Sequence, residues 1–138
     1  MKIPSAPPNK DRTPLSVIMQ RGDLMVAACP SREVLKHVTS RWGVLVLIAL
    51  EGRTLRFSQI RRKIGGVSER MLAQTLQWLE KDGIVMRVAF DVVPPHVEYS
   101  LTPLGVEAAE KVRLLADWIE ISMPRIAEGW SKRPDASS

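Results

Sequence analysis

Hydrophobic and polar positions repeat with the period of an α-helix between residues 68 and 82. Leu72, Leu76 and Leu79 recur at spacings of four and three, which places them on one side of a helix. Ser68 is a residue type that caps helix N-termini, and Asp82-Gly83 ends the pattern with a residue that tolerates left-handed backbone. The opposite side carries the hydrogen-bonding side chains of Arg70, Gln74 and Gln77, with Glu69 toward its flank. The pattern predicts a short helix with a polar outward face, although an ordinary amphipathic surface helix has the same pattern.

The segments on either side of this helix indicate its structural context. Phe57–Ile64 is short and helical in pattern, and Gly65-Gly66 follows as a tight turn. Two β-rich runs, Ile84–Asp91 and Val97–Leu101, come after the helix and are joined by a Pro-Pro loop. A helix, a turn, a second helix and a two-stranded ribbon predict a winged helix-turn-helix, a mainly α fold with a small β-wing.

The chain upstream predicts two further helices and a short strand. Pro30 opens the first helix with Cys29 or Ser31 as its cap, and three apolar residues are expected to line its inner side: Val34, Leu35 and Val38. Residues 41–50 are apolar nearly all round, as in a buried central helix that ends at Glu51-Gly52. Arg53–Arg56 is expected to form a short edge strand or an extended link.

Downstream of the wing, Thr102-Pro103 starts a helix that is predicted to run to about Ile121, and Pro124 is expected to end or kink it. Two apolar lines run along this helix. Because one line would suffice to pack on the domain, the second favours a homodimer, with a helix lying deep in its own fold as the alternative. The predicted dimer interface consists of Val112, Leu115, Trp118 and Ile119.

Length and composition indicate one globular domain among the 138 residues. We expect a flexible N-terminal extension over residues 1–24, a DNA-binding domain with its dimerisation helix over 25–127, and a flexible tail over 128–138. The single cysteine fits a reducing compartment, and the longest apolar run is too short to span a bilayer. The sequence therefore predicts a cytoplasmic protein that does not enter membranes.

Positive charge is concentrated in the predicted helix-turn-helix. Residues 52–70 contain six cations and one anion, so they carry a net charge of +5, equal to that of the whole chain. Such a distribution favours an anionic partner such as double-stranded DNA. Histidine and cysteine residues show no metal-ligand spacing, and the chain has no nucleophile–base pairing or phosphate-binding glycine loop. We therefore predict neither an enzyme, nor a metal site, nor a cofactor.

A series of short motifs runs in order along most of the chain: Cys29-Pro30, Arg41-Trp42, Leu55-Arg56-Phe57-Ser58, Gly66-Val67-Ser68, Arg70-Met71-Leu72, Gln74-Thr75-Leu76, Leu79-Glu80, Asp82-Gly83, Pro94-Pro95, Val97–Leu101 and Thr102-x-x-Gly105. Together they resemble the HxlR-type winged-helix transcriptional regulators of bacteria and archaea, from about Cys29 to Ile126. The resemblance implies a homodimer that binds a pseudo-palindromic operator as a repressor or an activator, often in responses to electrophiles, oxidants or aldehydes. A longer segment before Cys29 and the pair Gln77-Trp78 depart from the family pattern.

On this interpretation the helix after Ser68 enters the DNA major groove. The predicted base-reading residues are Ser68, Glu69, Arg70 and Gln74. The predicted DNA-backbone contacts are Arg53, Arg56, Arg61, Arg62, Pro95 and His96. Glu69 has an alternative role as a solvated charge that favours the helix N-terminus. The competing interpretation is a winged-helix module that binds proteins instead of DNA, which would favour acidic or apolar residues on the outward face of the helix.

Cys29 is the candidate for sensor chemistry. As a helix cap it would have a lowered pKa and react as a thiolate, and the resemblance implies that some family members use a cysteine here in an intersubunit disulfide. A partly buried structural thiol is the alternative. A small apolar effector near Trp42 or Trp118 is a further hypothesis that the sequence leaves open.

Overall fold

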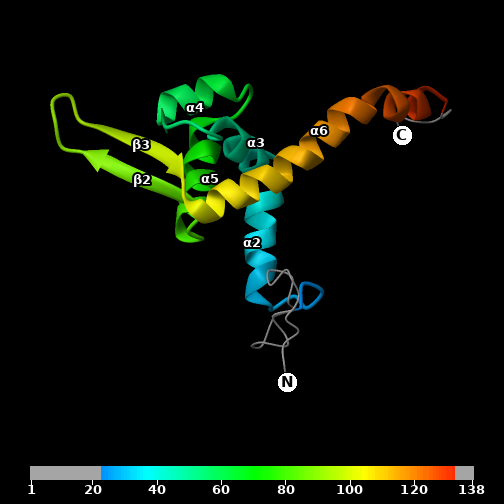
Figure 1. Cartoon of the computed structure of the whole chain (residues 1–138), viewed down its shortest axis with the longest axis horizontal. Coiled ribbons are helices and arrows are strands. Elements are labelled where there is room, and N and C mark those ends of the chain that lie inside the picture. Colours follow the sequence, from blue (N-terminus) through cyan, green and yellow to red (C-terminus); the bar gives the residue numbers. More distant parts are fainter. Residues whose placement is uncertain (1–22, 133–138) are drawn as a thin grey trace. The chain divides into compact units, whose positions relative to one another are not determined.

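A computed structural model describes residues 23–132, which fall into two units, one ending at His37 and one beginning at Val38. In the first unit, a helix α2 starts at Pro30, as predicted, and runs over Pro30–Thr39 across the boundary (Figure 1). The predicted extension over residues 1–24 lies outside the described residues except for its last two, and so does the end of the predicted tail. Within residues 23–132, no helix combines the length and the apolar character needed to cross a bilayer.

The second unit contains the predicted winged helix-turn-helix (Figure 1). Its elements follow in the order α3 (Arg41–Ala49), β1 (Leu55–Arg56), α4 (Phe57–Lys63), α5 (Glu69–Lys81), β2 (Val85–Phe90), β3 (His96–Leu101) and α6 (Pro103–Lys132). The strands form an antiparallel sheet in the order β1-β3-β2, with Leu55 opposite Tyr99 and Val85 opposite Leu101. Of the segment Arg53–Arg56, predicted as an edge strand or an extended link, Leu55–Arg56 forms an edge strand, and it makes the sheet of the wing three-stranded.

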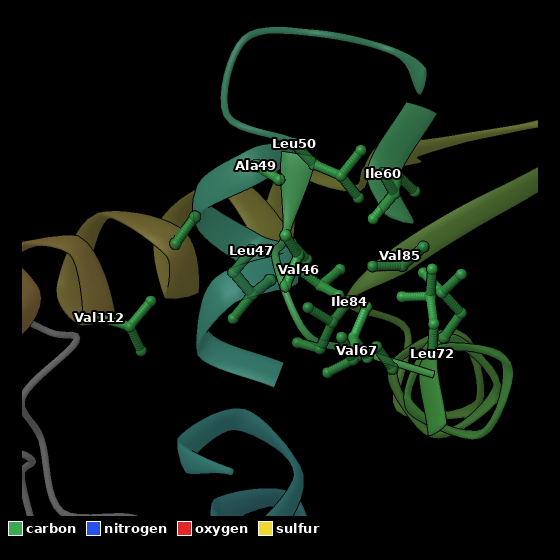
Figure 2. Packing of buried hydrophobic residues seen from close by; sticks show 14 residues of the cluster. Val46, Leu47, Ala49, Leu50, Ile60, Val67, Leu72, Ile84, Val85 and Val112 are labelled. Carbon is green, nitrogen blue, oxygen red and sulfur yellow. The ribbon is translucent and has the colours of Figure 1, made fainter. Parts of the chain in front are cut away.

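Helix α3 lies at the centre of the hydrophobic core of this unit (Figure 2). Val46, Leu47 and Leu50 are at most 1% exposed, as expected for a helix that is apolar nearly all round. Against them pack Ile60 from α4 and the buried side of α5. The core thus fixes the two helices of the helix-turn-helix relative to α3.

A compact junction links the end of α5 to the start of α6. Gly83 ends α5 in a left-handed conformation, with φ of +76°. The Thr102 hydroxyl donates to the carbonyl oxygen of Gly83 at 2.6 Å and accepts from the backbone N–H of Gly105 at 3.0 Å, so it also caps α6. A Cβ at position 105 would overlap the carbonyl oxygen of Ile84. Only glycine allows α6 to start this close to the wing.

The end of α6 differs from the prediction. The helix continues through Pro124 to Lys132 and has 30 residues, so residues 128–132 of the predicted tail are helical. A proline inside a helix removes one hydrogen bond and costs about 3 kcal/mol locally. The predicted helix end near Ile121 was wrong, because the local cost at Pro124 does not outweigh the residues on both sides of it that continue the helix.

The predicted inner side of α2 was wrong for two of its three residues, and the third, Val38, packs against the hydrophobic core. In the first unit, Val34 and Leu35 of α2 are 38% and 44% exposed, so they do not line an inner side. In α6, Val112 is 6% exposed and belongs to the hydrophobic core of its own subunit, and its part in a dimer interface stays a prediction. The helical period shows which residues share a face but not which element covers it.

Candidate nucleic-acid interface

Helix α5 is held rigidly at its start and along its inner side. The Ser68 hydroxyl accepts from the backbone N–H of Met71 at 3.0 Å, which is the predicted N-cap. Leu72, Leu76 and Leu79 are at most 2% exposed. A helix anchored in this way can present its other side in one fixed orientation.

The outward side of α5 is polar and accessible. Arg70, Ala73 and Gln77 are exposed, and Gln74 is half-buried. The side chains of Arg70 and Gln77 make no hydrogen bond or ion pair with other residues in the 23–132 range. Guanidinium and amide groups that are free in this way can donate to base edges. The structure therefore places Arg70 as predicted, and Gln74 closer to the domain than predicted.

A concave basic surface lies between α4 and the start of α5, with a volume of about 640 Å³. We call it the basic hollow; its polar lining residues are Ser58, Arg61, Arg62, Ser68 and Glu69. Arg61 donates to the carbonyl oxygen of Val67 at 3.2 Å and lies 3.3 Å from a Glu69 carboxylate oxygen. Glu69 thus has a role that neither sequence interpretation included, because it helps to hold Arg61 against the turn between the two helices.

The other arginines predicted to contact DNA backbone lie in different places. Arg62 is exposed in the basic hollow, and its side chain has no partner within the described part of the chain. Arg56 is exposed on β1, directly before α4, and its backbone N–H donates to Gln59 at 2.7 Å. Arg53 is exposed too, but it lines a separate hollow together with Lys63. The structure therefore brings Arg61 and Arg62 together and leaves Arg53 apart.

At the wing, Pro95 and His96 differ in their surroundings. Pro95 is exposed in the loop between β2 and β3. The His96 ring stacks on Phe90 with centroids 4.9 Å apart, and its Nε2 atom lies 3.1 Å from a carboxylate oxygen of Glu98. Since His96 is half-buried and already has an acidic partner, Pro95 is the better candidate for contact with a DNA backbone.

Sequence reasoning missed two residues beside α5. Arg87 of β2 and Tyr99 of β3 are opposite each other in the sheet, and together they line a hollow of about 390 Å³ with Ala73, Gln77 and Glu80 of α5. Alternation along β2 could have identified Arg87, because it shares a face with buried Val85 two positions earlier. The accessible face of α5 therefore continues onto the wing.

Cys29, in the first unit, is 9% exposed. Its Sγ atom lies 2.9 Å from the Ser31 hydroxyl. This hydrogen bond, helped by the Ser31 backbone N–H, lowers the pKa of the Cys29 thiol. The direction is the one predicted for a cysteine at a helix N-terminus.

The fold and this surface define a class: a winged helix-turn-helix protein with an accessible polar second helix beside a basic hollow. Comparison with known proteins gives the family. Residues 37–127 match the model of the HxlR-like helix-turn-helix family, so the chain belongs to that family. The predicted resemblance is thereby confirmed.

Individual relatives agree with this assignment. The HTH-type transcriptional regulator YtfH of Escherichia coli (strain K12) is 65% identical over 112 residues, which cover 81% of this chain and 89% of YtfH. A solved structure from Salmonella typhimurium, described as transcriptional regulator ytfH, has a TM-score of 0.77 and 62% identity, covering 81% of this chain and all of that one. The redox regulator HypR in its reduced form has a TM-score of 0.65 and 31% identity, over 72% of this chain and 98% of HypR. The family is one of transcriptional regulators and not of enzymes.

Proposed function

We propose that this protein regulates transcription by binding a pseudo-palindromic operator as a homodimer, with α5 of each subunit in the major groove. The observation that carries the proposal is the anchored helix whose exposed Arg70 and Gln77 side chains have no partner within residues 23–132. Arginine pairs naturally with guanine and glutamine with adenine. Ser68, Glu69 and Gln74 complete the set of residues near the bases.

Phosphate groups would be bound beside that helix. Arg61 and Arg62 in the basic hollow, with Arg56 nearby in sequence on β1, supply positive charge where the duplex backbone would pass. Arg87 and Pro95 extend this contact onto the wing. These groups fix the orientation of the protein on DNA, and α5 reads the sequence.

The homodimer is supported by apolar surface on α6. Leu115, Trp118 and Ile119 are 52%, 55% and 40% exposed, and Trp130 further along is 54% exposed. Large apolar side chains gathered on one helix are typical of a surface that a partner covers. Two-fold pairing through α6 would present two α5 helices to the two halves of a pseudo-palindromic site.

A redox response through Cys29 is a second element of the proposal. Its lowered pKa favours the thiolate, which is the form that oxidants and electrophiles attack. HypR, to which the chain is similar, is a redox regulator. Because the chain has one cysteine, a disulfide would have to join two subunits or a separate thiol.

The proposal is tested by measuring affinity for generic duplex DNA as a function of salt, followed by sequencing of the genomic fragments that the protein retains. Counterion release predicts affinity that falls steeply with rising salt, and retained fragments that share a two-fold motif. A winged-helix module specific for proteins would show no DNA binding at any salt concentration. Diamide treatment followed by a non-reducing gel tests a disulfide between two subunits: a dimer band that is lost in Cys29→Ser supports it, and a purely monomeric band contradicts it.

The homodimer is tested separately by sedimentation velocity. We expect a dimer for the unmodified chain and a monomer for Trp118→Glu, since a buried charge would oppose pairing. The matched control is Lys111→Glu, an exposed change on the same helix. A monomeric unmodified chain at micromolar concentration would contradict the proposed assembly.

A further inference from the structure

A third hollow, of about 360 Å³, lies apart from the basic hollow and from the hollow beside Arg87 and Tyr99. Its apolar floor is formed by Leu45, Ile48 and Ala49 of α3 with Ile64 at the end of α4. Arg53 and Lys63 line it as well, and all of these residues belong to the second unit. We call it the α3–α4 hollow. Its volume is near the lower end of the range of about 300–1,000 Å³ that is usual for small-ligand sites.

The two cations of this hollow are not neutralised by the residues that the structure describes. Arg53 and Lys63 are exposed and form no ion pair within residues 23–132. The Nε atom of Arg53 donates to the backbone carbonyl of Glu51 at 3.4 Å, which leaves both terminal nitrogens available. The side chain of Lys63 has no hydrogen-bond partner in the same range.

We propose that the α3–α4 hollow binds a small amphipathic anion, a carboxylate on a compact apolar body. The carboxylate would be held by Arg53 and Lys63, and the apolar body would lie on Ile48, Ala49 and Ile64. A DNA phosphate satisfies the two cations but makes no use of an apolar floor. Arg53 is therefore assigned to this site in preference to the DNA backbone.

The position of the hollow couples such a ligand to the proposed DNA contact. Ile64 and Gly65 line both hollows, so the turn between α4 and α5 is a wall that the two share. A bound carboxylate would offset one of the two positive charges next to the surface that faces DNA, and would lower the affinity of that surface for the duplex. This regulatory step rests on the proposed function, whereas binding of the anion does not.

Binding is tested on the full chain with sodium benzoate, using calorimetry and amide NMR spectra. We expect benzoate to bind, to shift the Gly65 amide, and to be weakened about tenfold by Arg53→Gln or Lys63→Gln, because each removes one charge-assisted contact. Benzamide, which lacks the charge, is the matched ligand control. Arg62→Gln is the matched protein control and should bind benzoate normally. No benzoate binding, equal binding of benzamide, or unchanged affinity in the two variants of the hollow would overturn the site.

Regulation is tested by duplex-DNA affinity with benzoate or with sodium chloride at the same ionic strength. We expect benzoate to weaken DNA binding severalfold in the unmodified chain, and Arg53→Gln to need about tenfold more benzoate for the same effect. An equal effect of the two salts would overturn the coupling. If the chain bound no DNA even without benzoate, the proposed function would fail. The calorimetry would still decide independently whether the α3–α4 hollow binds the anion.

Discussion

The Nε atom of Arg113 lies 3.0 Å from the Oε1 atom of Glu51, joining α6 to the end of α3 across 62 positions of the sequence. Asp117, one turn further along α6, lies 3.2 Å from another nitrogen of the same guanidinium. The hydrogen bond and the charge of Glu51 raise the pKa of Arg113 further above its already high value. Arg113 therefore links the proposed dimer helix to the helix on which the helix-turn-helix packs.

Replacing Arg113 by alanine should lower stability in a salt-dependent way. Arg113 is 41% exposed and Glu51 is 29% exposed at the side chain, so solvent screens the pair and the loss should be small. We expect the urea midpoint to fall at low salt and the difference to shrink in 1 M salt. Lys111→Ala, at the exposed Lys111–Glu110 pair of the same helix, is the control. Equal midpoints at low salt would show that the link does not contribute.

Gly105→Ala should destabilise the protein strongly. The added Cβ would overlap the Ile84 carbonyl oxygen, and backbone cannot move aside as a flexible side chain can. We expect a loss of about 1–3 kcal/mol in the free energy of unfolding, measured by urea denaturation. Gly129→Ala in the same helix has open space and should instead gain up to about 1 kcal/mol from helix propensity. Equal effects of the two substitutions would refute the proposed close approach.

Changes at Ser68 should separate helix stability from DNA binding. Ser68→Ala removes the N-cap of α5 and should cost about 1 kcal/mol of unfolding free energy. Ser68→Asp keeps a capping oxygen and should restore stability, but its negative charge beside the basic hollow should still weaken DNA binding. Thermal unfolding and duplex-DNA affinity are the two measurements. Normal DNA affinity in Ser68→Asp would contradict a DNA-facing position for this residue.

Arg70 and Arg62 should have different effects on DNA binding. Arg70→Ala should cost about 1–3 kcal/mol on the operator and reduce the preference for it over generic DNA. Arg62→Ala should weaken both kinds of DNA alike and lower the slope of log affinity against log salt by about one. Fluorescence anisotropy with operator and scrambled duplexes measures both effects. If both variants lost affinity uniformly, α5 would not be the element that reads sequence.

Thiol reactivity at Cys29 should depend on Ser31. The hydrogen bond from Ser31 lowers the pKa, so the thiolate in the folded chain should persist to lower pH than in the unfolded chain. The hydrogen bond between Ser31 and the Cys29 thiolate therefore stabilises the folded state fully at pH values above the thiol pKa of the unfolded chain. This stabilisation is lost as the pH falls through the lower pKa of the folded chain. The rate of iodoacetamide labelling, measured as a function of pH, should have its midpoint at a pH below the ordinary pKa of a cysteine thiol. In Ser31→Ala this midpoint should move to higher pH. An unchanged midpoint in that variant would exclude the hydrogen bond as the cause.

Most of the fold of residues 38–132 could be predicted because its boundaries depend on nearby residues. Ser68 caps α5, Gly83 ends it, and Thr102 caps α6, each within one turn of the helix concerned. Such signals act over a few residues, so they remain readable without a structure. The helix end wrongly predicted near Ile121 shows the limit of such signals, since the local cost of Pro124 was considered without the residues after it that continue the helix.

The candidate site was predictable in part for the same reason. Helical periodicity showed that Arg70 would share a face of α5 with Gln74 and Gln77, and the concentration of cations placed positive charge beside it. Neither signal showed that Glu69 pairs with Arg61, or that His96 pairs with Glu98 on the wing. Each of these pairs depends on the conformation of a turn or on side-chain geometry, which periodicity does not specify.

The sequence by itself determined the order of helices and strands, the polar face of α5 and the family, because all three depend on residue type and short spacing. Only the tertiary structure decided that Val112 is core, that Arg87 faces α5 with Tyr99, and that Arg113 meets Glu51. These contacts join residues far apart in the chain. Which of them meet is decided by how the helices and the sheet pack, and that packing is a property of the whole core.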